Sequence, residues 1–451
     1  ADMEFRNLTP FDALCFSALG MDDQEYPVLV MKVGYRLLPI DGQPGQFRAE
    51  VLDEDPLALC TADRYYGEEG ASSVCEESDL APFKPRCDVI VVGDAYAPRG
   101  QPATQWTAGL RISAPVAPPP RIDVPLPTPL SPGERLTEYQ LMAWQAAQQE
   151  AFKRRAEAPT RHYLLDKHLK FTGPRQFRHS LFGGWQLTEP QPATCVPLRW
   201  EYAFGGSSVV INPEHAADEN TPPYLLNEVC YSNPLGRGWI EKRQEDLGFQ
   251  LDKPLRELSA PQIEPIDKPV WRLDRVKHPE GELDANGMAQ IAASYKNQPV
   301  GFGVVGRAWA PRLPLAGRYD KTWQRERWPG LPRDFDFAYW NGAPVDQQID
   351  FPPPAFRLEL FNLTNPDLTP AGTLYVELPG HRPFVLMRLH NGAMLPLPML
   401  TDTLRIDTKA MTLALTHRIS LPNHLGIRVL EARFETDSNT PLIKRAAREM
   451  L

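Results

Sequence analysis

"YPVLVMKVGYRLLP" (residues 26–39) is rich in β-branched and aromatic residues and ends at a proline, which is typical of a β-strand. "CDVIVVGDAY" (87–96) has the same character and contains a glycine after its apolar run. From residue 3 to about residue 130, the sequence therefore predicts strands separated by turns.

The composition favours many short strands over long helices. The 451 residues include 48 prolines and 30 glycines, and this proline share is about twice the usual one. The two residue types together stay below the roughly 25–30% that marks a disordered chain. Hydrophobic residues make up 42% and aromatic residues 10% of the chain. We therefore expect a globular, mainly β protein whose short antiparallel strands form sandwich-like or barrel-like sheets.

A regular series of strand-length segments begins after "DFPPPAF" (350–356). "FRLELFNL", "GTLYVELP", "RPFVLMRL" and "MTLALTHRI" follow at even spacing, which is typical of a small antiparallel sandwich or barrel. We expect a β-rich domain over 3–350 and an antiparallel β domain over 351–451 that ends in a short helix beginning at Thr440. The proline-rich connector 114–134 indicates a further boundary within the first domain.

One well-capped α-helix is predicted over residues 132–157. It opens with "SPGE" (131–134), a capping box with proline at the first helical position, and closes near "KRR" (153–155). Most of its apolar residues share one stripe, which favours a helix packed on a sheet. Leu141 and Phe152 lie off that stripe, so a helix whose outlying apolar residues contact a partner remains open.

Charge and cysteine content exclude several classes of protein. The net charge of −9 and the pI near 5.6 argue against nucleic acid as the main partner. The six cysteines include no C-x-x-C pair, so neither a disulfide framework nor a zinc site is indicated. No apolar run approaches the roughly 18 residues that a membrane span needs, and no signal peptide is evident. We expect a cytoplasmic protein without membrane insertion.

The string Gly301-x-Gly303-x-x-Gly306 matches the spacing of a dinucleotide-binding loop. That motif needs a helix directly after it, because the pyrophosphate binds at the N-terminus of the helix. Pro311 and Pro314 remove backbone donors and disfavour helical conformation in the residues before them. We therefore predict glycine turns with positive φ between short strands, and no cofactor site.

No catalytic motif is present: the sequence lacks H-E-x-x-H, G-x-S-x-G and G-x-x-x-x-G-K-[ST]. Four carboxylates gather in one aromatic-rich segment, at Asp320, Asp334, Asp336 and Asp346. Paired carboxylates beside aromatic rings suit a glycosidase or a sugar-binding site, whereas Asp beside Arg and Gly usually stabilises a turn. The turn interpretation is favoured, and no catalytic or metal-binding residue is predicted.

Three unusual stretches carry a resemblance to a known family. They are "DRYYGEEGASSVCEESDLAPFKPRCDVIVVGDAYAPRG" (63–100), "FTGPRQF…WQLTEPQPATCVPLRWEYAFGG" (171–206) with the Asn212-Pro213 pair that follows, and "PVGFGVVGRAWAPRLPLAGRYDKTW" (299–323) with "LPRDFDFAYWNGAPVDQQ" (331–348). In this order they resemble the domain-of-unknown-function family 2169, which accompanies effectors of the bacterial type VI secretion system. The resemblance spans roughly residues 5 to 350.

The resemblance implies a non-enzymatic adaptor or chaperone. Such a protein would hold a toxic effector in the cytoplasm and help load it onto the VgrG spike, often through a PAAR tip. The positions that match the family motif are Glu77, Ser78, Asp79, Leu80, Pro82, Phe83, Lys84, Asp88, Tyr202, Phe204, Gly205, Gly206, Asn212, Pro213, Gly301, Phe302, Gly303, Arg307, Trp309, Pro311, Arg312, Tyr319, Asp320, Trp323, Asp334, Phe335, Asp336, Asn341, Ala343, Pro344, Asp346 and Gln347.

These motif residues are expected to act mostly as scaffold, because Gly, Pro, aromatic, Asp and Arg residues interleaved in this way fix turns and buried ion pairs. Trp, Tyr and Arg carry much of the binding energy in protein interfaces. The hypothetical partner contacts are therefore Arg307, Trp309, Arg312, Tyr319 and Trp323. A carbohydrate-binding or carbohydrate-active β protein that uses the 320–346 cluster, and a structural component of the secretion spike, remain as alternatives.

Overall fold

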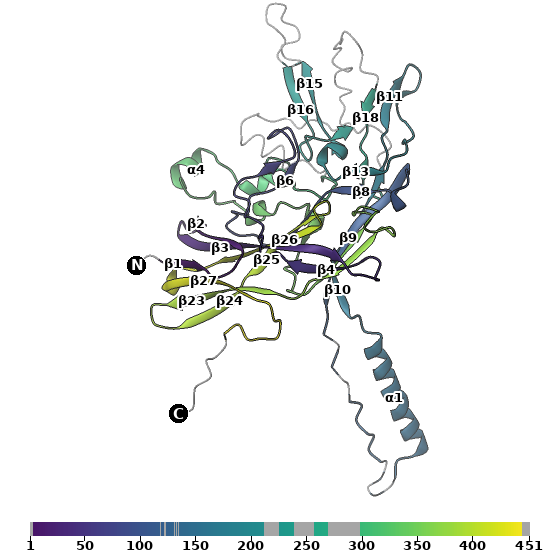
Figure 1. Cartoon of the computed structure of the whole chain (residues 1–451), viewed down its shortest axis with the longest axis vertical. Coiled ribbons are helices and arrows are strands. Elements are labelled where there is room, and N and C mark those ends of the chain that lie inside the picture. Colours follow the sequence, from purple (N-terminus) through teal and green to yellow (C-terminus); the bar gives the residue numbers. More distant parts are fainter. Residues whose placement is uncertain are drawn as a thin grey trace, which may run out of the picture.

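The computed structural model describes residues 3–443 except 118, 121–122, 130, 132, 134, 212–224, 239–256 and 269–297. Its dominant feature is a curled, half-barrel sheet of 12 strands (Figure 1). The strand order is β19-β10-β9-β21-β22-β4-β3-β26-β25-β7-β20, and β2 pairs with β3 beside β4. A smaller sheet has the order β1-β27-β23-β24. The predicted mainly β fold is confirmed.

The large sheet consists of β2 (Asp12–Leu19), β3 (Glu25–Pro39), β4 (Gln46–Val51), β7 (Cys87–Val92), β9 (Gln105–Pro115), β10 (Arg161–Thr172), β19 (Ile263–Glu264), β20 (Gln348–Ile349), β21 (Arg357–Phe361), β22 (Thr373–Glu377), β25 (Leu400–Asp407) and β26 (Thr412–Ser420). The four-stranded sheet contains β1 (Glu4–Asn7), β23 (Arg382–Leu389), β24 (Met394–Pro398) and β27 (Ile427–Glu435).

Shorter elements complete the described chain. The small sheets pair β5 (Arg64–Tyr65) with β6 (Val74–Glu76), β8 (Asp94–Tyr96) with β13 (Cys195–Pro197), β14 (Phe204–Gly205) with β17 (Arg237–Gly238), β15 (Ser207–Ile211) with β16 (Leu225–Val229), and β11 (Gln176–Ser180) with β12 (Gly184–Leu187) and β18 (Glu257–Ser259). The helices are α1 (Glu138–Ala156) and α4 (Lys321–Glu326), with 3₁₀ turns η1 (Pro98–Gly100), η2 (Trp200–Tyr202), η3 (Leu313–Ala316), η4 (Phe337–Trp340), η5 (Val345–Gln347) and η6 (Asn423–Leu425).

The stretch 26–39 forms β3, which lies in the middle of the large sheet. Residues 28–35 are buried without a break, and buried neighbours on one strand mean that both faces are covered, because side chains alternate between the faces. Leu29, Met31 and Val33 lie in the main apolar core. The opposite face therefore meets a second layer, and Lys32 points into that layer.

Strands from the two ends of the chain lie side by side in the same sheets. β21 pairs with β9, β26 with β3, and β1 with β27. The boundary expected at residue 350 thus does not coincide with a break between sheets. Most neighbours are antiparallel as expected, but β25 runs parallel to β7 and β22 runs parallel to β4. Parallel neighbours of this kind join segments distant in sequence, which the local pattern of the tail does not reveal.

The predicted helix exists, but it begins later than expected and packs on no sheet. Its capping box is formed by Thr137 and Gln140 rather than by residues 131–134. The Nε1 of Trp144 donates to the carbonyl of Val124, so the proline-rich connector runs along one side of the helix. None of the α1 residues is buried, and Figure 1 shows α1 projecting away from the sheets. We call residues 116–160 the helical arm.

The helix predicted from Thr440 falls mainly on residues 444–451, which lie outside the described residues. Residues 441–443, which are described, are not helical.

The glycines at 301, 303 and 306 serve a different purpose from the one predicted. No strand adjoins them in the described chain, and none of the three has a positive φ. A Cβ added at Gly301 would lie 2.7 Å from the indole of Trp200, and one at Gly306 would lie 2.5 Å from the indole of Trp309. The expectation of positive-φ turns is therefore wrong for this loop, where close approach to two tryptophans requires glycine. As predicted, no α-helix follows directly, and the 3₁₀ turn η3 begins at Leu313.

Gly301→Ala is expected to lower the free energy of unfolding by about 1–3 kcal/mol, because the new methyl group must displace the buried Trp200 ring. Gly303→Ala is the matched control, since its Cβ would meet nothing closer than 3.4 Å. Urea unfolding followed by tryptophan fluorescence measures both variants. Equal midpoints for the two variants would contradict the packing explanation.

Candidate functional site

Four polar side chains form a row across the face of the large sheet that lies away from the main core. The register places Lys32 of β3 beside Thr416 of β26. Thr403 of β25 follows Thr416, and Asp88 of β7 completes the row. Their neighbours along the same strands point the other way, into the main apolar core, as expected from alternation: Met31, Leu415, Leu404 and Val89. We call these four residues the polar row.

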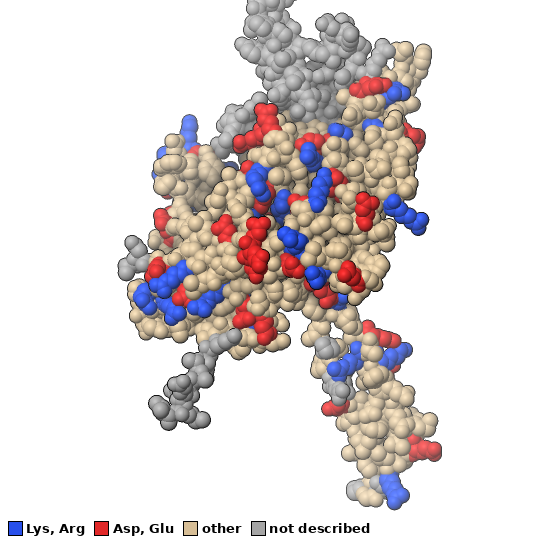
Figure 2. All heavy atoms as spheres, viewed as in Figure 1, with Lys and Arg blue, Asp and Glu red and all other residues tan. Residues whose placement is uncertain are grey.

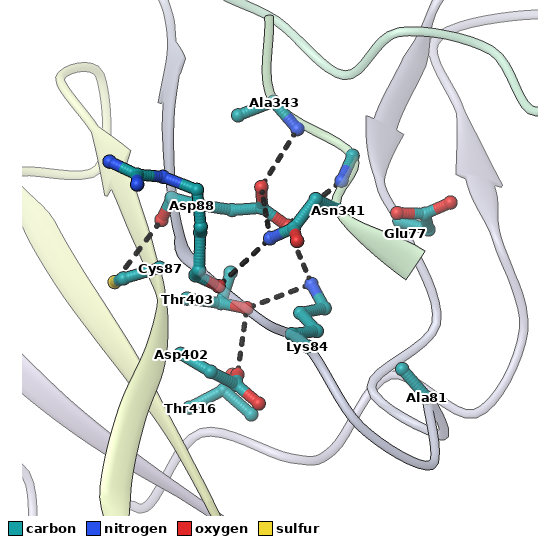
Figure 3. Close-up of polar contacts among 12 residues, drawn as sticks. Glu77, Ala81, Lys84, Cys87, Asp88, Asn341, Ala343, Asp402, Thr403 and Thr416 are labelled. Carbon is teal, nitrogen blue, oxygen red and sulfur yellow. Dashed lines mark hydrogen bonds and ion pairs between the residues drawn. The ribbon is translucent and has the colours of Figure 1, made fainter. Parts of the chain in front are cut away.

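Asp88 accepts four hydrogen bonds at one end of the row (Figure 3). Its Oδ2 accepts from Lys84 Nζ at 2.8 Å and from the Gly342 backbone N–H at 2.9 Å. Its Oδ1 accepts from Asn341 Nδ2 at 3.0 Å and from the Ala343 backbone N–H at 3.1 Å. The carboxylate is 1% exposed, so it joins β7 to the loop 341–343 in a region that excludes water.

Lys32 and Asp79 occupy the other end of the row. Lys32 Nζ lies 2.7 Å from Glu76 and 2.5 Å from Asp79. Asp79 also accepts a hydrogen bond of 2.9 Å from Thr416. The Arg418 guanidinium lies in the same layer, where it bonds to Asp402 at 2.5 Å and donates to the backbone carbonyl of Asp79. Motif residues 77–88 are thereby fixed to three strands of the sheet.

Glu77 joins this layer to the third motif block. Its Oε1 accepts from Arg307 Nε and from Arg312 Nη1, each at 2.8 Å. Burial alone would raise the pKa of Glu77, but the charges of Arg312, Lys84 and Arg307 hold it below its ordinary value of 4.5. The carboxylate therefore stays ionised at neutral pH and is engaged by two guanidiniums, so it is poorly placed to transfer protons.

Lys167 on β10 anchors a second part of the third block. Its ammonium group donates to the Gly301 carbonyl at 2.7 Å, to Gln347 Oε1 at 2.6 Å and to Asp346 at 2.8 Å. Burial lowers the pKa of Lys167 below its usual value of 10.5, and the charge of Asp346 offsets only part of this effect. Since all three donors of the ammonium are engaged, the geometry is that of a structural anchor rather than of a nucleophile.

The five hypothetical contact residues divide into two groups. Arg312 is 3% exposed and bonds to Glu77 and to the Tyr339 carbonyl. Arg307 shares Glu77, and Trp309 packs edge-to-face on Trp200 at 5.5 Å. Tyr319 and Trp323, by contrast, pack on each other in a projecting segment around α4. We call this segment, residues 317–334, the α4 lobe. A direct role in partner binding stays a prediction for all five: Arg312 is buried, Arg307, Trp309 and Trp323 are half-buried, and Tyr319 is exposed.

Several other motif residues make internal contacts, whereas Phe83 is 40% exposed. The Ser78 backbone N–H donates to Asp63 at 2.8 Å. Phe204 and Gly205 form β14 beside β17. Gly205 has a φ of +143° and is closely approached by Asn233, and both features require glycine. Asn212 and Pro213 lie outside the described residues.

The four carboxylates that suggested a sugar site do not converge on one another. Asp320 caps α4 by accepting from the Thr322 and Trp323 backbone N–H groups, and Asp336 caps η4. Asp334 pairs with Arg318 at 3.0 Å, and Asp346 pairs with Lys167. Each carboxylate is thus engaged in local turn or ion-pair chemistry, as the turn interpretation predicts.

The described part of the chain contains no cluster of metal ligands, and its pockets range in volume from about 30 to about 640 Å³. No group of three or more His, Cys, Asp or Glu side chains there is arranged to hold a metal ion. The cavity within the polar layer, lined by Lys32, Glu77 and Lys84, has a volume of only about 30 Å³. A shallower pocket of about 370 Å³ is lined mainly by apolar side chains, including Phe83, Phe351 and Leu400.

Sequence reasoning missed two sets of residues. Lys32, Asp402 and Arg418 complete the buried layer but lie in strands whose sequences indicate only β-structure. Trp328 is 69% exposed on the α4 lobe and stands 5.6 Å from Trp323. The combination of a tryptophan, two prolines and three arginines within residues 325–333 was the available signal for a surface loop.

The fold and the polar layer define a mainly β protein whose motif residues act as an internal scaffold. The chain belongs to the family described as "Uncharacterized protein conserved in bacteria (DUF2169)", whose model matches residues 22–418. The match extends beyond residue 350 into the tail strands that carry Thr403, Thr416 and Arg418. No curated protein and no solved structure matches the chain. None of the helices in its described part combines the length and apolar composition that a bilayer crossing requires.

Asp88→Asn is expected to lower the free energy of unfolding by about 3–5 kcal/mol, because it leaves the buried Lys84 ammonium without its carboxylate. Asp350→Asn is the control: its side chain is exposed and pairs with Arg86 at the surface, so a change of at most about 1 kcal/mol is expected. Chemical denaturation compares the two variants. A small effect of Asp88→Asn would show that Lys84 finds another partner.

The protein is expected to lose stability as the pH falls below about 6.5. Burial lowers the pKa of His417 to about 3 from its ordinary 6.5, so the unfolded chain binds a proton that the folded chain excludes. This group alone lowers the free energy of unfolding by about 1.4 kcal/mol per pH unit between these values. The contribution of Glu77, whose pKa is depressed, is present above 4.5 and is lost as the pH falls further.

His417→Gln should flatten the pH dependence between pH 6.5 and 4.5, and the exposed His162→Gln should not. Urea midpoints measured across this range compare the two variants with the parent protein. A parent protein whose midpoint is constant from pH 7 to 5 would contradict the burial of a neutral His417.

Proposed function

We propose that this chain is a non-enzymatic adaptor or chaperone that binds a type VI secretion effector in the bacterial cytoplasm and helps load it onto the VgrG spike and its PAAR tip. Membership of the DUF2169 family supports the proposal through the resemblance of the three motif blocks. Many motif residues form internal ion pairs and hydrogen bonds, as Glu77 and Asp88 do, and this supports a role without catalysis.

The helical arm is the observation that carries the protein-binding role. Pro115 of β9 pairs with Arg161 of β10, so residues 116–160 leave the sheet and return to it at one point. Three large apolar side chains on α1 face solvent, with exposed fractions of 82% for Tyr139, 63% for Met142 and 76% for Phe152. Burying such side chains in a partner yields about 1.5–3 kcal/mol each, which favours an arm used for binding.

The arm is built to hold its shape without the sheet. The capping box satisfies the first turn of α1, and basic residues Lys153, Arg154 and Arg155 occupy its last turn. The connector braces the helix through Trp144 and through a bond from Gln140 to the Thr128 carbonyl. A helix that is ordered beforehand loses less conformational entropy on binding.

The face opposite the brace is the one open to a partner. Tyr139, Met142 and Ala146 recur at intervals of three and four residues, which is the spacing of anchors in helix-in-groove recognition. Uncharged side chains cover the middle of the arm, and charged ones gather toward its ends (Figure 2). The arm therefore suits an apolar groove or helix on the partner protein.

A combined Tyr139→Ser, Met142→Ser, Phe152→Ser variant is expected to weaken capture of the toxin encoded by the neighbouring gene at least about 100-fold, since interface anchors of this size each contribute about 1 kcal/mol or more. Co-expression followed by affinity purification and titration measures the effect. The midpoint of thermal unfolding should stay unchanged, because the three side chains make no core contacts.

Gln145→Ser and Gln149→Ser together, on the same exposed helix, form the matched control and should bind as the parent protein does. Full binding by the triple variant would remove the arm from the interface. Catalytic turnover of sugars, esters or nucleotides by the purified protein would contradict the non-enzymatic role, and its presence in secreted particles would favour a spike component.

A further inference from the structure

We propose that the α4 lobe, residues 317–334, is a second docking surface, and that its partner is an acidic protein segment carrying a large apolar side chain. This goes beyond the proposed function, because it assigns a contact that is independent of the helical arm. The inference rests on the aromatic side chains, the charge and the fixed geometry of the lobe.

Three aromatic rings form the apolar part of this surface. Trp323 lies between Tyr319 and Trp328, with ring centroids 4.7 Å and 5.6 Å away. Trp328 is 69% exposed and Tyr319 is 44% exposed. The rings cross at 71° and 88°, so they form no flat platform for stacking a sugar, but they leave an irregular apolar surface that a protruding side chain can fill.

The lobe is positively charged in an otherwise acidic protein. Residues 317–334 contain five Lys or Arg and three Asp or Glu, whereas the whole chain has a net charge of −9. Asp334 and Glu326 are engaged by Arg318 and Arg333. In the described part of the chain, no carboxylate pairs with Lys321 or Arg325. An acidic segment is therefore attracted to Lys321 and Arg325 on this lobe.

The lobe is held rigidly to the body. Arg327 binds both carboxylate oxygens of Asp23, in the turn between β2 and β3, at 2.6 Å and 2.9 Å. It also donates to the backbone carbonyls of Met21 and Leu331. Trp323 Nε1 donates to the Gly330 carbonyl at 2.9 Å. Because the surface exists before binding, little ordering opposes association.

The α4 lobe and the helical arm project from widely separated parts of the molecule (Figure 1). One partner on the arm and another on the lobe can therefore be bound at the same time. A protein that hands one molecule to another needs two such surfaces, and this geometry supplies them.

Fluorescence anisotropy with defined peptides tests the lobe. The probe is a labelled 14-residue peptide of glutamates with two leucines and one tryptophan, and its comparisons are the same peptide with lysine for glutamate and the same peptide with alanine for the apolar residues. Saturable binding is expected for the first peptide only, and it should weaken at least about tenfold between 50 and 300 mM salt.

Trp328→Ala and Arg325→Glu should each weaken binding of the acidic peptide at least about tenfold. Tyr139→Ala and Lys153→Glu on the arm make the matched aromatic and charge changes at exposed positions and should leave it unchanged. Circular dichroism checks the fold, and the surface change Arg325→Glu keeps the test valid if Trp328→Ala unfolds the lobe.

Equal affinity for the lysine peptide, equal loss in the arm variants, or unchanged binding by both lobe variants would each overturn the proposal. Tighter binding of a 14-nucleotide single-stranded DNA, measured in the same assay, would overturn it in favour of nucleic acid. Because toxin capture by the arm is measured separately, failure of the lobe leaves the adaptor proposal standing, and failure of the arm leaves the lobe standing.

Discussion

The buried carboxylate of Asp88 is the contact on which the arrangement of the motif segments depends. It accepts from one side chain four residues earlier and from three groups about 250 residues later. A buried charge is tolerated only when its acceptors are filled, so the two segments must be present together. The row from Asp88 to Lys32 extends this requirement across four strands, and it makes the two ends of the chain parts of one folded unit.

The alternation of side chains explains why a β-sheet can carry such a layer. In β3, β7, β25 and β26, successive residues face the apolar core and the opposite face in turn, so β3, β7 and β26 are almost continuously buried and β25 alternates between buried and half-buried residues. Each strand therefore stabilises the fold twice, through apolar burial on one face and through paired charges on the other. The segment 77–88 covers part of the second face of the large sheet, so no second sheet is needed there.

Local pattern predicted those features of the molecule that depend on neighbours in sequence. Strands 26–39 and 87–92, the lack of an α-helix directly after Gly306 and the turn chemistry of Asp320, Asp334 and Asp336 follow from composition and spacing alone. The predicted start of α1 at residue 132 was wrong. The helix is capped at Thr137 and Gln140 instead, and Gln140 and Trp144 bond back to the connector. The carboxylate partners of Lys32 lie more than 40 residues away and the partners of Asp88 in the 341–343 loop about 250 residues away, and no periodicity in the sequence reports such distances.

Residue type alone also does not distinguish an interface from an interior. Trp309 and Arg312 have the composition of interface anchors, yet one packs on Trp200 and the other fills its donors with Glu77 and two carbonyls. Tyr139 and Trp328 differ from them in exposure, since their side chains are 82% and 69% exposed. Each lies on a segment whose helix has its own N-terminal cap. The helical arm and the α4 lobe thus each combine a locally bonded backbone with exposed aromatic rings, and the adjacent Leu181 and Phe182 are exposed as well.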